Sequence, residues 1–257
     1  MGSDSFAARA ATYSNSVWHA ELADAFVRWL GLEAGLTVVD VGTGTGFAAL
    51  AVDGAAGTRV VGMDASPAMV GVARERAQAA GRTGAVGFAV GDGHRLGLRD
   101  GCADAVLFCT SLQYMEVGRA LGEAGRIVRP GGTVAIGTLA KGTMGPSVVY
   151  RRLLAEHGVQ TPDRMGAIGS PGRLTALLEA AGLSEVETGR DVLRLADADL
   201  ADAWPVGAAM DERRLGGLDL DALRRQYEAR VAAARAEDED GFRTITMLMA
   251  RARRRDR

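Results

Sequence analysis

Three carboxylates in the first part of the chain stand where they could bind one ligand together. Asp40 precedes a glycine-rich sequence, Asp64 ends an apolar run, and Asp92 stands between two glycines. A carboxylate accepts hydrogen bonds from vicinal hydroxyls or from an amine. Taken singly, each acid could instead be a turn or cap residue. Because each accompanies the end of a predicted strand, we expect all three at the same edge of one sheet.

The glycine-rich sequence is Asp40-Val41-Gly42-Thr43-Gly44-Thr45-Gly46, after the strand-like residues 37–39. Glycine lets the backbone adopt positive φ and lets a ligand approach closely. A helix expected over 47–56 would point its N-terminal amides at that ligand. The dinucleotide fingerprint needs a third glycine where Phe47 stands, which disfavours an NAD(P)-dependent reductase. A glycine-rich turn that binds nothing is the other alternative.

The elements that must position these residues alternate along the chain. The apolar patterns predict strands over residues 37–41, 58–64, 85–90, 103–109, 133–138, 183–195 and 242–250. They predict helices over residues 17–30, 47–56, 66–81, 116–128, 148–154, 174–181, 199–215 and 220–236. This alternation indicates an α/β fold with a doubly wound, mostly parallel sheet that binds ligands at the strands' carboxyl ends. We expect one domain over 1–257, with an N-terminal helical cap (1–35), a core (36–140), and lid helices with the final strands (141–257).

Composition excludes several classes of protein. The chain of 257 residues has a formal net charge of −2, which argues against a nucleic-acid partner. Its 2 cysteines and 3 histidines are scattered, so we expect no metal site. No signal sequence or membrane span is indicated, and we expect a cytoplasmic protein. The basic run 251–255 is expected to be a solvated tail.

Four segments together resemble the class I S-adenosylmethionine (SAM)-dependent methyltransferases. They are the turn 40–46, Asp64, the Gly-Asp-Gly sequence 91–93, and Glu-Ala-Gly-Arg-Ile-Val-Arg-Pro-Gly-Gly at 123–132. The last is similar to the family's "E-x-x-R-V-L-R-P-G-G" element, in the branch of ubiquinone/menaquinone and natural-product methyltransferases. The resemblance covers roughly residues 10–140. It implies a seven-stranded Rossmann-like methyltransferase fold, SAM as cofactor and S-adenosylhomocysteine as product.

The resemblance also implies roles for particular residues. Around the methionine portion of the cofactor it implies the turn residues Gly42, Thr43, Gly44 and Gly46. Around the adenosine portion it implies Asp64 on the ribose, and Ala65, Met69, Asp92 and Gly93 at the adenine. Asp40 would favour the ammonium group of the methionine portion. Cys109 and Gln113 would line the methyl-donor side.

The acceptor site is less marked in the sequence. Related small-molecule methyltransferases often carry a histidine after the fourth strand, where this chain has Leu112-Gln113-Tyr114. Candidate catalytic groups are therefore Tyr13, His19 and Tyr114, with His157 also considered; a packing role is the alternative for each histidine. Residues 108–111 lack the Asp/Asn-Pro-Pro-Tyr run of nucleic-acid methyltransferases, which favours a small-molecule acceptor.

Other features of the acceptor side stay open at the level of sequence. The Met- and Leu-rich segment after residue 140 favours a partly apolar acceptor, with Trp204 and Met210 beside its pocket. The acceptor atom (O, N or C) is not specified, and the protein could be a monomer or a homodimer. A SAM-binding protein that does not methylate is a further alternative.

Overall fold

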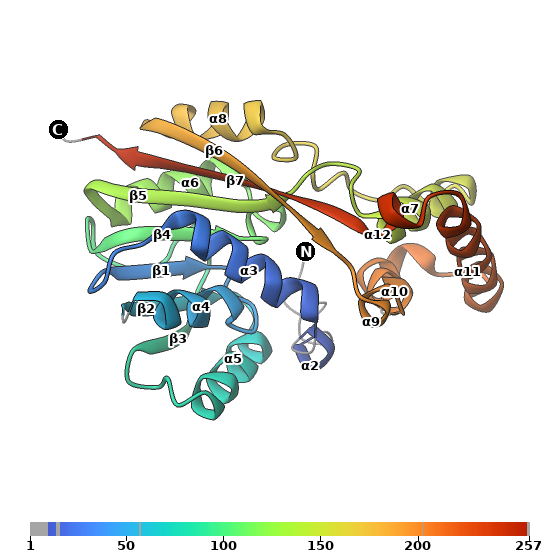
Figure 1. Cartoon of the computed structure of the whole chain (residues 1–257), viewed down its shortest axis with the longest axis horizontal. Coiled ribbons are helices and arrows are strands. Elements are labelled where there is room, and N and C mark those ends of the chain that lie inside the picture. The colour runs from blue at the N-terminus through green and yellow to red at the C-terminus, as the bar shows by residue number, and fades with distance from the viewer. Residues whose placement is uncertain (1–9, 14–15, 57, 202, 256–257) are drawn as a thin grey trace.

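A computed structural model describes residues 10–13, 16–56, 58–201 and 203–255, and it contains a single seven-stranded sheet among them (Figure 1). The strand order is β3-β2-β1-β4-β5-β7-β6. The strands are β1 (Thr37–Val41), β2 (Arg59–Asp64), β3 (Val86–Val90), β4 (Ala103–Cys109), β5 (Val128–Leu139), β6 (Leu183–Arg194) and β7 (Thr244–Arg254). β7 pairs antiparallel with both of its neighbours, and the other pairs are parallel. The predicted fold class is confirmed.

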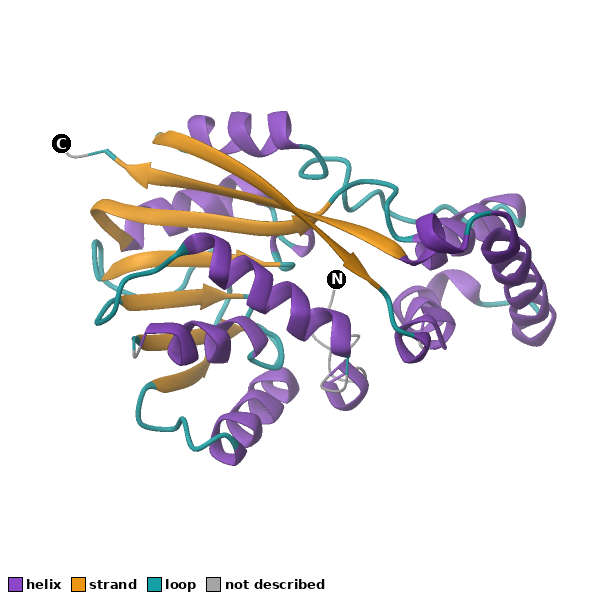
Figure 2. Ribbon diagram, in the orientation of Figure 1, coloured by secondary structure: helices purple, strands orange, loops and turns teal. Residues whose placement is uncertain are grey.

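Helices cover both faces of this sheet (Figures 1 and 2). One face carries α3 (Val17–Leu30), α4 (Phe47–Ala56) and α5 (Pro67–Ala79). The opposite face carries α6 (Val117–Ile127) and α8 (Pro171–Ala180). The short elements α2 (Ala10–Tyr13) and η1 (Leu112–Tyr114) lie at the site described below. Of the predicted cap, residues 1–9, 14 and 15 lie outside the described part of the chain.

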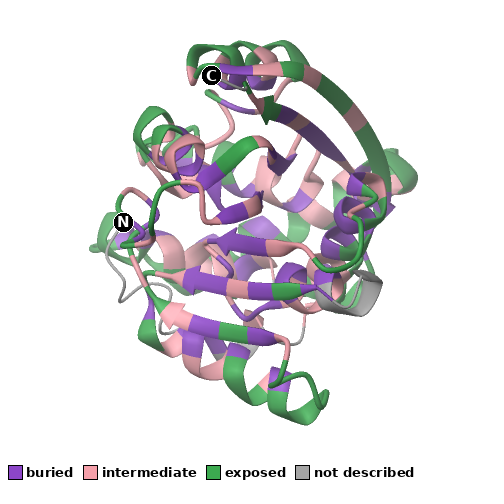
Figure 3. Ribbon diagram, turned by 90° about the vertical axis from the view of Figure 1, so that its left-hand side faces the viewer, coloured by how far each residue is buried: buried purple, intermediate pink, exposed green. Residues whose placement is uncertain are grey.

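Two apolar clusters form the core between these layers. In β1 the side chain of Val38 belongs to the cluster under α3 and α4, and that of Val39 to the cluster under α6 and α8. Successive side chains of a strand point to opposite faces, so a strand covered on both sides is apolar at every position. Figure 3 shows this burial along the central strands, with exposed residues on the outer helix surfaces.

Local signals explain where the helices begin after the strands. Ser66 follows β2 and caps α5, because its hydroxyl accepts a hydrogen bond from the Met69 amide at 3.4 Å. Pro67 occupies the first turn, where a missing amide hydrogen costs nothing. Glu116 caps α6, and its carboxylate accepts from the amides of Gly118 and Arg119. The turns at the strands' carboxyl ends are thereby held in place.

Five further helices form a lid beyond those carboxyl ends (Figure 1). They are α7 (Gly145–Glu156), α9 (Asp197–Ala201), α10 (Ala203–Leu215), α11 (Leu220–Glu237) and α12 (Glu239–Arg243). The lid has an apolar cluster of its own, in which Tyr150, Trp204 and Tyr227 pack together. Every described residue of the helix predicted over 199–215 is helical, in α9 and α10. Trp204, expected beside a pocket, is only 8% exposed inside this cluster.

The basic run 251–255 is mostly not a solvated tail as predicted, because β7 extends through residue 254. Arg251 forms an ion pair with Glu187 of the neighbouring strand at 2.7 Å. Arg253 and Arg254 donate to backbone carbonyls of the segment around β5. Residues 129–132, expected to precede the fifth strand, belong to β5, where its register against β4 shifts. These four residues form the irregular stretch of β5 between Val128 and Thr133, which both pair with β4.

Candidate active site

The turn between β1 and α4 lies at the middle of the sheet's carboxyl edge. Its glycines Gly42 and Gly46 have φ of 70° and 86°, a conformation that disfavours other residues. A Cβ on Gly42 would lie 2.5 Å from Cβ of Ser111, so the close approach of two strand ends also requires glycine. The turn is therefore held tightly against the end of β4.

Most backbone amides of this turn donate hydrogen bonds to other groups of the protein. Those of Gly42 and Thr43 donate to the Met63 carbonyl at 2.7 and 3.0 Å, and that of Gly46 donates to Thr43. The Gly44 amide donates to Asp64 Oδ2 at 2.9 Å. These four amides of the turn are therefore already paired within the protein, and the expectation about the first amides of α4 stays a prediction. The arrangement does not suit a diphosphate, which binds to such amides in dinucleotide folds.

A cavity of about 300 Å³ opens over the turn. It is lined by Tyr13, Gly42, Gly44, Asp64, Ala65, Ser66, Met69, Gly91, Asp92, Gly93, His94, Thr110, Ser111, Tyr114 and Met115. Among these described residues there are two carboxylates and no lysine or arginine. The cavity is therefore suited to a positively charged ligand with hydroxyl and amine donors, such as SAM, because its sulfonium and ammonium groups are cationic.

Two acids, the buried Asp40 and the half-buried Asp64, set the charge at the turn. Burial raises the pKa of Asp64, and the amides of Ser66 and Gly44 oppose that rise by donating to its two oxygens. Burial raises the pKa of Asp40 to about 6. Asp40 Oδ2 accepts from the Thr43 hydroxyl at 2.6 Å, and Oδ1 has no hydrogen-bond partner among the described residues. A nearby cation would favour the ionised form of both acids.

The third acid is tied to α6 through a histidine. Asp92 Oδ1 accepts from the His94 amide at 2.9 Å and lies 2.6 Å from His94 Nδ1. The His94 amide is the largest cause of the lowered pKa of Asp92. His94 Nε2 accepts from the Glu116 amide at 2.9 Å, so its proton is on Nδ1, which donates to Asp92. The loop after β3 is thereby connected to the start of α6.

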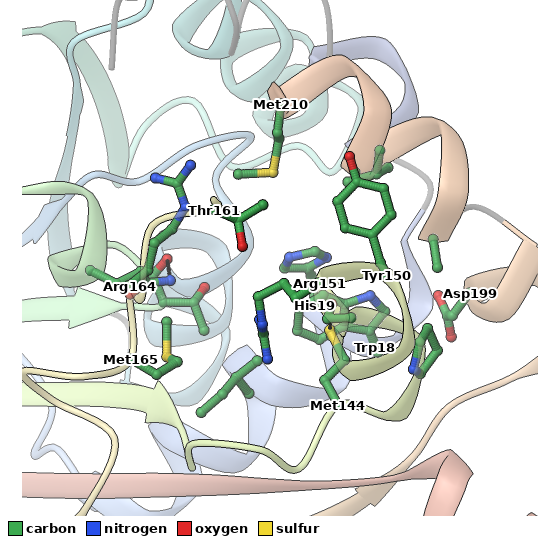
Figure 4. Close-up of a pocket in the computed structure, with 18 of the residues that line it drawn as sticks. Trp18, His19, Met144, Tyr150, Arg151, Thr161, Arg164, Met165, Asp199 and Met210 are labelled. Atoms are coloured by element: carbon green, nitrogen blue, oxygen red, sulfur yellow. Dashed lines mark hydrogen bonds between the residues drawn. The ribbon is translucent and has the colours of Figure 1, made fainter. Parts of the chain in front are cut away.

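A second cavity, of about 240 Å³, lies between the sheet and the lid (Figure 4). Thr161 and Arg164 lie on one side of it, and Tyr150 and Asp199 lie on the opposite side. Much of the remaining wall is apolar, with Leu139, Met144, Pro146, Pro162, Met165, Val206 and Met210. The wall thus combines segments from the N-terminal helices, the end of β4, the β5–α7 region and α10.

The two cavities share three lining residues, Tyr13, Thr110 and Tyr114. Thr110 directly follows β4 and has φ of 49°, which is uncommon for a residue other than glycine. Its amide donates to the Gly137 carbonyl at 2.7 Å, and this bond helps to hold the strained conformation. The shared wall marks where a molecule in one cavity would meet a molecule in the other.

Aromatic side chains pack together at this junction. The rings of Tyr13 and His19 have centroids 4.0 Å apart, and Trp18 and His19 have centroids 3.5 Å apart. His19 Nδ1 lies 2.7 Å from the Ser16 hydroxyl. Tyr114 lies beneath the Arg164 guanidinium, whose Cζ is 5.3 Å from the ring centroid. The three candidate catalytic residues Tyr13, His19 and Tyr114 therefore all line the second cavity.

The structure separates the other predicted residues into two groups. Gly42, Gly44, Asp64, Ala65, Met69, Asp92 and Gly93 line the first cavity. Asp40, Thr43, Gly46 and Cys109 line neither cavity, and Gln113 lines only the second. Asp40, Thr43 and Gly46 lie within or behind the turn, and Cys109 packs against the core. His157, on the lid, lies 3.2 Å from the Gln226 carboxamide oxygen and lines neither cavity.

Several lining residues were not predicted from the sequence. Thr110 and Ser111 follow β4 directly, and their place at a strand's carboxyl end was a usable signal. Tyr150, Arg151 and Arg164 come from segments remote in sequence, and no local pattern marks them. In the described part of the chain, no group of three His, Cys, Asp or Glu side chains could hold a metal ion.

The sequence is similar to those of known proteins. A model of the methyltransferase domain family matches residues 39–136. A demethylmenaquinone methyltransferase of Thermus thermophilus is 33% identical over 164 residues, covering 57% of this chain and 74% of the relative. A 27-O-demethylrifamycin SV methyltransferase of Amycolatopsis mediterranei is 29% identical over 235 residues, covering 90% of this chain and 82% of the relative.

A solved structure has the same fold. Phosphoethanolamine N-methyltransferase 2 of Haemonchus contortus, in complex with SAM, superimposes with a TM-score of 0.58 at 17% identity, covering 90% of this chain and 52% of that chain. The chain belongs to the class I SAM-dependent methyltransferases. SAM is the cofactor of this class, and the first cavity, with its two carboxylates, fits it. No helix within the described residues is long and apolar enough to cross a membrane.

Proposed function

We propose that this methyltransferase transfers the methyl group of SAM to a small, partly apolar molecule bound in the second cavity. The observation that carries the proposal is the meeting of the two cavities at Tyr13, Thr110 and Tyr114. The names of two relatives, a demethylmenaquinone and a demethylrifamycin methyltransferase, agree with a small-molecule acceptor. The methylated atom, whether O, N or C, is left open.

The chain's contribution to the reaction is mainly positioning. When bound, SAM supplies a methyl group activated by its positively charged sulfur. Asp64 and Asp92 would accept hydrogen bonds from the ribose and adenine groups, and Asp40 beneath the turn favours positive charge nearby. Tyr13, Thr110 and Tyr114, where the two cavities meet, would align the acceptor atom with the methyl group of SAM and exclude water.

A side chain where the two cavities meet would remove the proton from the acceptor. Tyr13, His19 and Tyr114 are the candidates, because each lines the acceptor cavity. Tyr13 and Tyr114 also line the cofactor cavity, which supports these two over His19. A general base must lie within hydrogen-bond reach of the proton that it removes.

Binding of SAM to Asp64→Ala tests the cofactor site. We expect the Kd for SAM, measured by isothermal titration calorimetry, to rise about tenfold or more, because a hydrogen bond to a charged acceptor is lost. Asp191→Ala changes an exposed acid on β6 and should leave the Kd unchanged. Undiminished affinity in Asp64→Ala would remove this residue from the ribose site.

Methyl transfer is tested by product formation. Purified protein with SAM and fractions of a small-molecule extract should form S-adenosylhomocysteine with at least one fraction. The same fractions should give far less product with Asp64→Ala at a SAM concentration near the wild-type Kd. Tight SAM binding with no product from any fraction would favour the alternative of a SAM-binding protein that does not methylate.

A further inference from the structure

We propose that the acceptor is an amphipathic organic anion, whose carboxylate, sulfonate or phosphate group is held by Arg151 and Arg164. Both arginines line the second cavity, one from α7 and the other from the segment between α7 and α8. This inference rests on the proposed function, since it concerns the molecule that the second cavity receives. It adds a charged recognition group to an acceptor otherwise expected to be apolar.

The two guanidinium groups have no carboxylate partner within the described chain. Neither Arg151 nor Arg164 belongs to any of its ion pairs, although five other arginines of the lid do. The charge of Arg151 contributes to the lowered pKa of Asp163, but the Asp163 carboxylate already forms an ion pair with Lys141 at 2.5 Å. Two cations without an ion-pair partner in the same cavity wall attract an anion, and the half-buried Arg164 does so more strongly than it would in open water.

The acids in the same wall have partners of their own. Asp211 is 6% exposed and forms an ion pair with Arg214 at 2.8 Å. Asp199 Oδ2 accepts from the Ala196 amide at 3.1 Å, and Figure 4 shows Asp199 on the side of the cavity opposite Arg164. Neither Asp199 nor Asp211 therefore neutralises the positive charge on the side of the cavity where Arg164 lies.

The rest of the cavity wall suits an acceptor whose main part is apolar. Met144, Met165 and Met210 surround the cavity, and methionine side chains adapt to irregular apolar shapes. An ion that was small and fully hydrated would leave this surface unfilled. A molecule with an apolar body and one anionic group satisfies both parts of the wall.

The position of Arg164 orients such a molecule. Its guanidinium lies over the ring of Tyr114, which also lines the cofactor cavity. The anionic group would therefore bind near the end of the cavity that faces the cofactor. Guanidinium groups bind carboxylate and phosphate in a fixed, forked geometry, so this contact would also fix the rotation of the acceptor.

Two fluorescent probes of the same shape test the proposal. 1-Anilinonaphthalene-8-sulfonate is an apolar anion, and N-phenyl-1-naphthylamine is its neutral counterpart. In the variant Arg151→Gln/Arg164→Gln we expect the Kd of the sulfonate to rise about tenfold or more, while that of the neutral probe changes less than about twofold. Arg164→Lys, which keeps the charge, should lose less than the double variant.

Arg152→Gln is the matched control, because Arg152 is the next residue of α7 and does not line the cavity. It should leave both probes unchanged. The proposal is overturned if the double variant binds the sulfonate as well as wild type does, or if both probes lose affinity equally. SAM binding to the same proteins is measured separately, so failure of the wild type to bind SAM would reject the proposed function and not this charge preference.

Discussion

At the scale of single residues, the buried carboxylate of Asp40 is the group whose charge matters most for the cofactor side. It is 1% exposed, and one of its oxygens has no hydrogen-bond partner in the described chain. Burial raises its pKa from 3.8 to about 6. The folded protein therefore holds its ionised form at a cost in stability, and a cationic ligand nearby would reduce that cost.

Asp40→Asn should change the pH dependence of stability. Between pH 4 and pH 6 the unfolded chain loses the Asp40 proton while the folded chain retains it, so wild-type stability falls as pH rises through this window. The uncharged amide lacks this decline. The free energy of unfolding of Asp40→Asn relative to wild type should rise by about 1–3 kcal/mol from pH 4 to pH 7, measured by urea denaturation.

Asp191→Asn, at an exposed position on β6, serves as the control for that series. It should show no comparable rise relative to wild type. A difference between Asp40→Asn and wild type that is constant over pH 4–7 would contradict the assigned pKa of Asp40.

At the scale of elements, helix α3 carries His19 to the junction and is anchored on strand β6. A Cβ added to Gly189 of β6 would lie 2.4 Å from Nε1 of Trp29, near the end of α3. Trp29 also lies beneath Arg251 of β7, whose Cζ is 5.4 Å from its ring. The close contact of Trp29 with the backbone of β6 therefore helps to set the position of the helix.

Gly189→Ala should lower the free energy of unfolding by about 1–3 kcal/mol, because the added methyl group displaces Trp29. Thermal and urea denaturation measure the effect. Gly87→Ala is a matched control on strand β3, where nothing lies within 4 Å of the added Cβ. If both variants unfold like wild type, Trp29 does not anchor α3 in the way inferred here.

At the scale of the whole molecule, the two cavities depend on different parts of the chain. Every described residue that lines the cofactor cavity lies between Tyr13 and Met115, whereas the acceptor cavity is closed by α7 and α10 of the lid. The lid has its own apolar cluster, separate from the two clusters of the sheet. Damage to the lid should therefore affect the acceptor cavity and spare the cofactor cavity.

Leu153→Ala tests this separation, because Leu153 is fully buried in the lid cluster. Loss of the side chain should cost about 2–5 kcal/mol and weaken binding of the sulfonate probe. The Kd for SAM, measured below the unfolding transition, should stay within about twofold of wild type. Leu107→Ala in strand β4 is the contrasting variant, since it lies beneath the cofactor site and should weaken SAM binding as well.

Most of the sheet, the glycine-rich turn and the positions of the acids that line the first cavity could be predicted from residue patterns alone. The alternation of strands and helices, the glycines at 42–46 and the positions of Asp64 and Asp92 are local patterns. Parallel strands present their carboxyl ends at one edge of the sheet, so residues at those ends come together. Their positions could be predicted because neighbours in the sequence largely set their geometry.

The second cavity, in contrast, forms only where segments far apart in the chain come together. Thr110 reaches both cavities through a backbone conformation held by Gly137, and Arg151 and Arg164 meet the site from the lid. Residues 251–254 belong to a strand because they pair with β5 and β6. Each of these outcomes depends on contacts between segments far apart in the chain, and no local pattern of residue types encodes such contacts.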